Sequence, residues 1–344
     1  MDRGGLGCLH ESEDIMNGEL IAAEYAEAGA AAHQGRRRVL AMFPGQGSQR
    51  EGMAAHLIRE HPGTAGAVFE SAEQCLGLPL RELCVEADAE RLRATEVAQP
   101  AILATALATF EVLRAEGFTP DLVAGHSLGE FAALAAAGVL ELADALALVR
   151  LRGELMAEIA AAVPGAMTAV AGVPAARIEE ICAGIGGVVE LANYNAPDQS
   201  VISGTAEAVA AATELLRAEG ANSLVALRVG APFHCSLMAE LEERFAAGLH
   251  LADFRNPTTT VISSVTAHPV STGQQARDLL RRQLTAPVRW IEVIAAATEL
   301  GCTDYLEIGP GRVLSGLANR MVGAATVRST QDARRIAAAV AEYA

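Results

Sequence analysis

The sequence predicts an α/β fold in which a parallel sheet is interrupted by a smaller unit with a sheet of its own. Three observations predict it. Short, continuously apolar segments alternate with helical segments, a strand runs into a helix through a serine between glycines, and the strand pattern changes in mid-chain. Apolar segments of this kind are typical of strands buried on both faces of a parallel sheet. The length of 344 residues suits one α/β body with an inserted piece.

Composition narrows the classes of function. Apolar residues make up 51% of the chain and aromatic residues 4%, so we expect an aliphatic core between closely packed helices. The net charge of -16 argues against nucleic acid or an anionic membrane as the main partner. The six cysteines form no C-x-x-C pair and have no zinc-ligand spacing with the histidines. We therefore expect reduced thiols, no metal and a cytoplasmic location.

Two stretches need to be separated from the fold. Residues 1–37 have weak periodicity and lack the order of a signal peptide, so we expect a poorly ordered N-terminal extension. The uncharged run 159–176 is long enough to resemble a membrane span. Two prolines and two glycines interrupt it, which favours a helix end, a turn and a strand, and no membrane partner.

The fold begins with an apolar strand at 39–43, followed by the glycine-rich loop 44–49. Open α/β sheets bind ligands at the carboxyl ends of their strands, so this loop suits a backbone that closely approaches a substrate. The alternative is a simple turn. Helical patterns follow at 54–58, 66–76 and 101–115.

A strand at 121–124 then runs into Gly125-His126-Ser127-Leu128-Gly129, the G-x-S-x-G pattern of a nucleophile elbow. So sharp a turn leaves no room for a Cβ at the glycines, and it places the serine at a helix N-terminus, which favours developing negative charge. The pattern also fits a glycine-bordered turn with an incidental serine. The helix 141–160 follows with Arg150 and Arg152, which base rates place on a solvated face.

The pattern changes between residues 164 and 230. Strands are expected at 167–172, 188–194, 200–204 and 223–229, and helices at 175–182 and 206–219. This βαββαβ order predicts a ferredoxin-like small subdomain. It is inserted into an α/β-hydrolase-like large subdomain made of residues 38–163 and 231–344.

The large subdomain continues with alternating helices and strands. We expect helices at 237–247, 274–284 and 291–300, strands at 259–264 and 304–308, and a further helix opening after the loop 309–312.

A serine nucleophile needs a base within hydrogen-bond reach, and eight histidines compete for that role. His234 is the best candidate, because it lies on a Gly/Pro-bearing loop directly after a predicted strand. His126 adjoins Ser127, but adjacent side chains diverge at a sharp turn, so we expect it to support the elbow. The other histidines lie in the extension, among polar helix neighbours or in a turn.

Several separated motifs together are highly specific: Phe43 to Gln49, Gly125 to Glu130, Arg152-Gly153, Asn193-Tyr194-Asn195 and Phe233-His234. With them, residues 39 to about 330 resemble the malonyl-CoA:acyl-carrier-protein transacylase family. This family includes discrete enzymes of bacterial fatty-acid synthesis and the embedded or freestanding acyltransferases of polyketide synthases.

The resemblance implies roles for individual residues. Ser127 would carry the acyl group as an ester, with His234 as its general base, and the backbone carbonyl of Gln283 would orient that histidine. The backbone N–H groups of Gln46 and Leu128 would form the oxyanion hole.

Substrate binding is implied in the same way. Arg152 would hold a malonyl carboxylate. This role would place Arg152 in the site and not on the solvated helix face that base rates predict. Asn193 would line the acyl pocket, and we place His126 beside it. Leu128 and Phe233 favour malonyl over methylmalonyl, although one methyl group is worth only about 1–3 kcal/mol.

The implied reaction is ping-pong transfer of malonyl from malonyl-CoA to the phosphopantetheine thiol of an acyl carrier protein, without a metal or redox cofactor. Carrier proteins are acidic, so we expect a local cluster of arginines and lysines at the pocket mouth. We also expect a monomer.

Four alternatives stay open. A serine hydrolase of the esterase or thioesterase kind would need an acidic residue to orient His234. A freestanding editing acyl hydrolase shares the fold, but such enzymes usually lack an arginine like Arg152. A transferase of substituted malonyl units, or an inactive carrier-binding module, completes the set.

Overall fold

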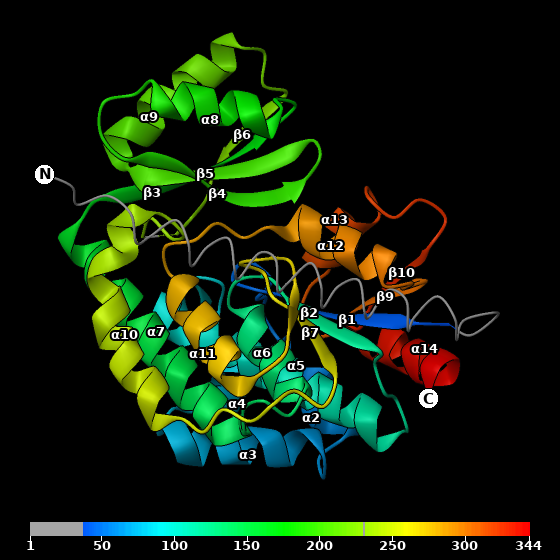
Figure 1. Cartoon of the computed structure of the whole chain (residues 1–344). Helices are drawn as coiled ribbons and strands as arrows, with labels where there is room; N and C mark the ends of the chain where they lie inside the picture. Colours follow the sequence, from blue (N-terminus) through cyan, green and yellow to red (C-terminus); the bar gives the residue numbers. More distant parts are fainter. Residues whose placement is uncertain (1–36, 230) are drawn as a thin grey trace, which may run out of the picture.

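The computed structural model describes residues 37–229 and 231–344, so nearly all of the predicted extension 1–37 lies outside the described residues. Two bodies are visible, a large one and a small one above it in the view of Figure 1. Each has its own sheet. The α/β fold with a parallel sheet and a small inserted sheet is confirmed.

The large subdomain contains a sheet of order β10-β9-β1-β2-β7-β8, in which only the edge strand β8 is antiparallel. The strand β1 lies at its centre and is buried along its whole length, as the apolar sequence predicts. In chain order, the strands are β1 (Val39–Phe43), β2 (Leu122–Gly125), β7 (Thr260–Ile262), β8 (Pro269–Val270), β9 (Asp304–Glu307) and β10 (Thr326–Ser329).

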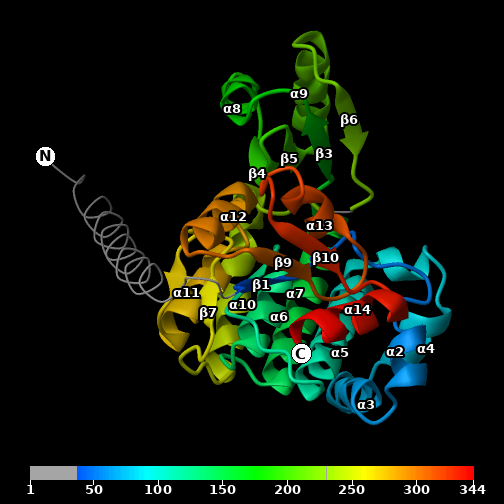
Figure 2. The same ribbon diagram turned by 90° about the vertical axis from the view of Figure 1, so that its right-hand side faces the viewer.

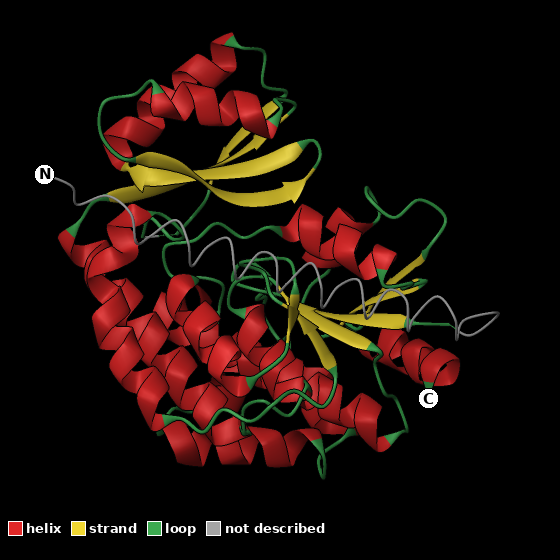
Figure 3. Ribbon diagram, viewed as in Figure 1, coloured by secondary structure: helices red, strands yellow, loops and turns green. Residues whose placement is uncertain are grey.

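Helices cover both faces of this sheet (Figure 3). The helices of the large subdomain are α2 (Ala55–Glu60), α3 (Ala65–Leu76), α4 (Leu80–Glu86), α5 (Thr95–Ala115), α6 (Gly129–Ala136), α7 (Leu142–Ala162), α10 (Ala239–Leu251), α11 (Gly273–Arg282), α12 (Trp290–Glu299), α13 (Val313–Ala318) and α14 (Ala333–Tyr343). Alternate residues of β1 point to opposite faces. Ala41 and Phe43 pack in the core with α3, α5, α6 and α7, whereas Leu40 and Met42 pack with α12 and α13.

The small subdomain has the antiparallel order β4-β5-β3-β6. Its elements are β3 (Gly165–Ala171), α8 (Ala175–Ala183), β4 (Val189–Ala196), β5 (Gln199–Thr205), α9 (Ala206–Ala218) and β6 (Ser223–Ala226), in the predicted βαββαβ order. Its core is separate from those of the large sheet and includes Val170, Ile178, Ile202 and Leu216. Figure 2 shows the small sheet standing over α12 and α13.

Some elements differ from the predictions. β6 ends at Ala226 instead of residue 229. α5 begins at Thr95, so Pro100 lies inside this helix. No element was predicted for α4, β8, β10 or α14, or for the single turns η1 (Arg91–Arg93) and η2 (Ser236–Met238), because most of these segments are too short to show a period.

Among the described residues, one helix is long and apolar enough to match a membrane span. It is α5, and 83% of its most apolar window is buried inside the protein. α5 therefore fits the role of a core helix. The run 159–176 instead contains the end of α7, a turn and the strand β3, as predicted.

Candidate active site

Ser127 lies in a strained turn between β2 and α6. Its φ is 52°, a value that residues other than glycine rarely adopt. A Cβ on Gly125 would lie 2.0 Å from the carbonyl carbon of Gly129, and one on Gly129 would lie 1.9 Å from the oxygen of Phe43. Both positions therefore require glycine, as the elbow pattern predicts.

His234 stands against the serine. The distance from Ser127 Oγ to His234 Nε2 is 2.7 Å, and His234 Nδ1 lies 2.9 Å from the carbonyl oxygen of Gln283 and 3.1 Å from that of Ala286. Because carbonyls only accept, Nδ1 carries the hydrogen and Nε2 is free to accept the serine proton. The structure thus places the Gln283 carbonyl where the resemblance implies it, and it adds Ala286.

The environment of His234 keeps its imidazole neutral. Burial is the largest cause, the positive charge of Arg152 the second and the neighbouring His126 the third, and together they lower the pKa of His234 from 6.5 to about 3. The ring is therefore unprotonated at neutral pH and can act as a proton acceptor.

Arg152, from α7, is only 2% exposed, so the solvated-face interpretation is wrong for this residue. Its Nη1 donates to Gln99 Oε1 at 2.9 Å, and its Nη2 lies 3.1 Å from Ser127 Oγ and 3.3 Å from Gln283 Oε1. Burial lowers the pKa of Arg152 to about 10, which leaves it charged at neutral pH. Arg150, by contrast, pairs with Glu154 at the surface.

A buried carboxylate completes this cluster. Glu130 is 2% exposed and accepts hydrogen bonds from Gln283 Nε2 at 2.6 Å and from Ser264 Oγ at 2.5 Å. Burial raises the pKa of Glu130, while the bonds from Ser264 and Gln283 oppose the rise. The sequence alone predicts no role for Glu130 or Ser264. An acid at the start of an otherwise apolar helix is the signal that could have found the first of them.

The two predicted oxyanion donors lie on segments in direct contact. A Cβ on Gly45 would come within 2.4 Å of the oxygen of His126, so the loop that carries Gln46 packs on the elbow that carries Leu128. In the described part of the chain, neither backbone N–H has an acceptor. Both are available to a developing oxyanion.

A cavity of about 150 Å³ lies between the two subdomains. Five predicted residues besides the serine line it: Gln46, His126, Asn193, Phe233 and His234. Three predicted residues do not line it: Arg152, Leu128 and Gln283. Two of these still contact Ser127, Arg152 through the hydroxyl oxygen and Gln283 through the backbone carbonyl oxygen.

His126 is held away from the serine. Its Nε2 lies 2.8 Å from Asn195 Oδ1, and its ring packs edge-to-face on Trp290 at 5.5 Å between centroids. Asn195 also lines the cavity but was given no role from the sequence.

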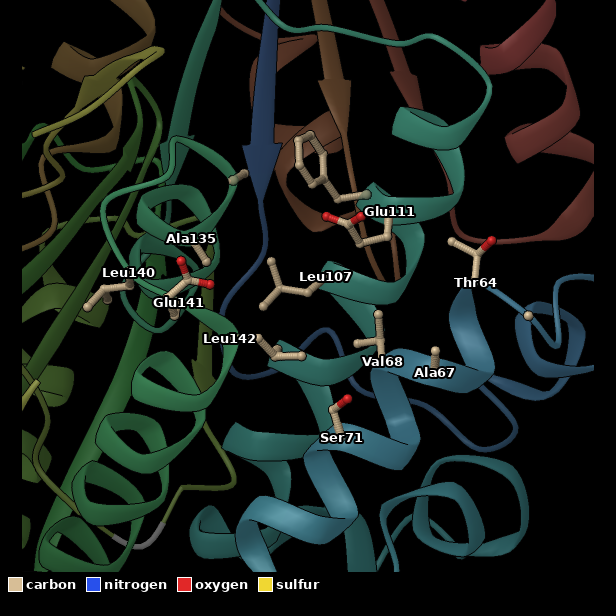
Figure 4. Close-up of a pocket in the computed structure, with 13 residues that line it drawn as sticks. Thr64, Ala67, Val68, Ser71, Leu107, Glu111, Ala135, Leu140, Glu141 and Leu142 are labelled. Atoms are coloured by element: carbon tan, nitrogen blue, oxygen red, sulfur yellow. The ribbon is translucent and has the colours of Figure 1, made fainter. Parts of the chain in front are cut away.

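A larger cavity, of about 540 Å³, lies among α3, α5, α6 and α7 (Figure 4). Its lining includes no histidine, cysteine or arginine, and its two acids already pair outward, Glu111 with Arg114 and Glu141 with Arg255. Its hydroxyls, on Thr64 and Ser71, have no histidine beside them in the lining to accept their protons, so we place the chemistry in the smaller cavity. Across residues 37–229 and 231–344, no three His, Cys, Asp or Glu side chains come together as a metal site.

Comparison with known proteins gives a consistent result. The acyl transferase domain family matches residues 41–339. The malonyl CoA-acyl carrier protein transacylase of Bacillus subtilis (strain 168) is 42% identical over 287 residues, which cover 83% of this chain and 90% of the relative. That of Escherichia coli (strain K12) is 38% identical over 302 residues, or 87% of this chain and 97% of the relative.

Solved structures agree. The malonyl CoA-acyl carrier protein transacylase of Coxiella burnetii has a TM-score of 0.86 at 36% identity, covering 91% of this chain and 99% of that one. A malonyl-transacylase in complex with a type II polyketide synthase acyl-carrier protein has a TM-score of 0.85 at 38% identity, covering 88% and 99%. On these similarities, and on the geometry around its serine, the chain belongs to the malonyl-CoA:acyl-carrier-protein transacylase family of acyltransferases.

Proposed function

We propose that this protein transfers a malonyl group from malonyl-CoA to the phosphopantetheine thiol of an acyl carrier protein, for fatty-acid or polyketide synthesis. One observation carries the proposal. The buried cation Arg152 lies 3.1 Å from the same serine oxygen that His234 contacts at 2.7 Å. A nucleophile beside a fixed guanidinium suits an acyl group with a carboxylate at its far end.

In the first half-reaction, Ser127 Oγ attacks the thioester carbonyl carbon while its proton passes to His234 Nε2. The N–H groups of Gln46 and Leu128 stabilise the oxyanion, and Arg152 holds the carboxylate. The carbon–sulfur bond then breaks, and the CoA thiolate takes the proton from His234. The products are a malonyl-serine ester and free CoA.

The second half-reaction runs in the opposite sense. The carrier thiol gives its proton to His234 and attacks the ester carbonyl, and Ser127 Oγ leaves and recovers the proton. Two backbone carbonyls orient His234, so no acidic third residue takes part. The proposed cycle uses only these groups and the two thioesters.

The carrier would approach over the cavity mouth. The chain has no lysine, so any basic docking surface consists of arginines. Arg228 follows the cavity residue Leu227, and Arg312 precedes the cavity residue Val313. Both arginines are exposed, and within the described ranges neither has an acidic partner. We propose that they bind the acidic carrier.

We also propose that the protein acts in the cytoplasm. All five cysteines of the described residues are free thiols. Such thiols suit the reducing cytoplasm that the proposed reaction implies.

Intact-protein mass spectrometry tests the transfer. Wild type, Ser127→Ala and Arg152→Ala are incubated briefly with equal malonyl-CoA, methylmalonyl-CoA and acetyl-CoA, with Arg150→Ala as the matched control on the same helix. We expect a malonyl adduct on wild type and Arg150→Ala, none on Ser127→Ala, and acetyl in place of malonyl on Arg152→Ala. Preferred acetyl loading on wild type, or release of free malonate at the loading rate, would favour the editing hydrolase instead.

A further inference from the structure

The side chain of Gln283 joins the nucleophile, the cation and the buried acid. Its Nε2 donates to Ser127 O at 3.1 Å and to Glu130 Oε2 at 2.6 Å, and its Oε1 accepts from Arg152 Nη2 at 3.3 Å. We propose that Glu130 is a positioning residue that fixes the Gln283 amide and thereby holds Arg152 in place for the substrate carboxylate. This inference rests on the proposed malonyl transfer.

The chemistry of the acid determines which way the amide faces. Glu130 already accepts from Ser264 Oγ and from the Ser264 backbone N–H, so it is held in one position. An ionised carboxylate only accepts hydrogen bonds. The NH₂ group of Gln283 must therefore face Glu130, which leaves its carbonyl oxygen facing Arg152.

The opposite orientation would be unfavourable at both ends. It would place the Gln283 NH₂ against the guanidinium, where both groups are donors, and the carbonyl against the carboxylate, where both are acceptors. A buried donor left without a partner is costly. Glu130 thus keeps the Gln283 carbonyl oxygen facing Arg152, where it accepts a hydrogen bond from the guanidinium.

Arg152 has few other restraints. Besides Gln283, it is held by the Gln99 amide oxygen and by Ser127 Oγ, and its Nε has no hydrogen-bond partner among the described residues. It also lies over the Phe131 ring at 5.9 Å. Losing one of two amide acceptors should leave the guanidinium free to turn away from the bound carboxylate.

The test compares kcat/KM for loading of Ser127 from malonyl-CoA and from acetyl-CoA, since acetyl carries no carboxylate. In Glu130→Gln, whose neutral amide no longer selects one orientation of Gln283, we expect the malonyl-to-acetyl ratio to fall about tenfold or more. Gln283→Met removes the amide but keeps the carbonyl that His234 uses, so it should lower the same ratio. If Glu130→Gln folds poorly, Gln283→Met still tests the inference.

Glu307→Gln is the matched control, because Glu307 is another fully buried carboxylate, bonded to Ser315 and the start of α13. We expect Glu307→Gln to change kcat/KM for malonyl-CoA and for acetyl-CoA by the same factor. The double variant of Glu130→Gln with Gln283→Met should lose no more selectivity than Gln283→Met alone, because the acid acts through the amide.

A parallel fall for both substrates in Glu130→Gln, additive losses in the double variant, or an unchanged ratio in Gln283→Met would overturn the inference. Failure of the underlying function is distinguishable, since wild type itself would then show no preference for malonyl-CoA.

Discussion

The two sides of the active-site cavity differ in what they contribute. The large subdomain supplies the nucleophile Ser127, the base His234 and the cation Arg152. The small subdomain supplies uncharged lining only, such as Asn193, Asn195, Met167, Val201 and Leu227. The large side therefore carries the reacting groups, and the small side encloses the acyl group with uncharged side chains.

The two sides also differ in how they are held. On the large side, Ser127 and His234 both have positive φ, and close backbone contacts hold the elbow. On the small side, Asn193 in β4 is tied to the large subdomain through an isolated bridge to Val288. Strained, closely packed segments preorganise a reaction, whereas a separately cored lobe can vary in sequence with less effect on the chemistry.

The largest contrast should come from one substitution on each side. Ser127→Ala should reduce acyl-enzyme formation on the order of 10⁴-fold or more, because no other hydroxyl or thiol of the described residues lines the cavity. Asn193→Ala should leave a functional serine and change the rate far less. Burst kinetics with malonyl-CoA measure both, and comparable losses would show that the small subdomain takes part in the chemistry.

The next contrast concerns packing. A Cβ at Gly129 would lie 1.9 Å from Phe43 O, so Gly129→Ala should lower the free energy of unfolding by about 3 kcal/mol or more. Gly316 in α13 has nothing within 4 Å of its Cβ position, and Gly316→Ala should raise stability by up to about 1 kcal/mol. Denaturant titration compares the two, and equal effects would mean that the elbow can relax.

Much of this arrangement could be predicted from the sequence, because it depends on local pattern. The elbow glycines, the buried strand β1 and the βαββαβ order all follow from steric or periodic rules. Glu130, Ser264 and Asn195 could not be given roles, since each acts through a partner more than 60 residues away. The size of the cavity likewise depends on how two lobes meet.

The pH profile examines the large side alone. A protonated imidazole cannot accept the serine proton, so the acid limb of kcat/KM follows the pKa of His234, lowered to about 3 by burial and by Arg152. Loading from acetyl-CoA should therefore stay nearly constant as the pH falls from 8 to about 5. In Arg152→Ala the limb should move to higher pH, because a positive charge is removed. An unmoved limb, or a wild-type limb near 6.5, would contradict this electrostatic account.

Selectivity should depend on a residue of the large side that acts only through its shape. Phe233 lines the cavity beside His234 and is 7% exposed. Phe233→Ser should shift loading toward methylmalonyl-CoA by about tenfold, the usual worth of one methyl group in a pocket. Competition between the two CoA esters, read by mass, measures the shift. An equal shift in Val201→Ala, a cavity residue of the small subdomain, would show that the small subdomain sets the width of the cavity.

The smallest expected effects lie at the mouth, where the two sides meet. Arg228→Glu on the small side and Arg312→Glu on the large side should each raise KM for the carrier about three- to tenfold. The increase in KM should be larger at lower salt concentration, because charges at the rim of an interface act mainly on the rate of association. Malonyl-CoA loading should not change. Arg217→Glu, in an exposed pair on α9, is the charge-matched control. If only one arginine matters, the carrier docks on a single subdomain. If both arginines matter, the carrier contacts both subdomains. The small subdomain, which lines the cavity with uncharged side chains only, then contributes the charge of Arg228 to carrier binding.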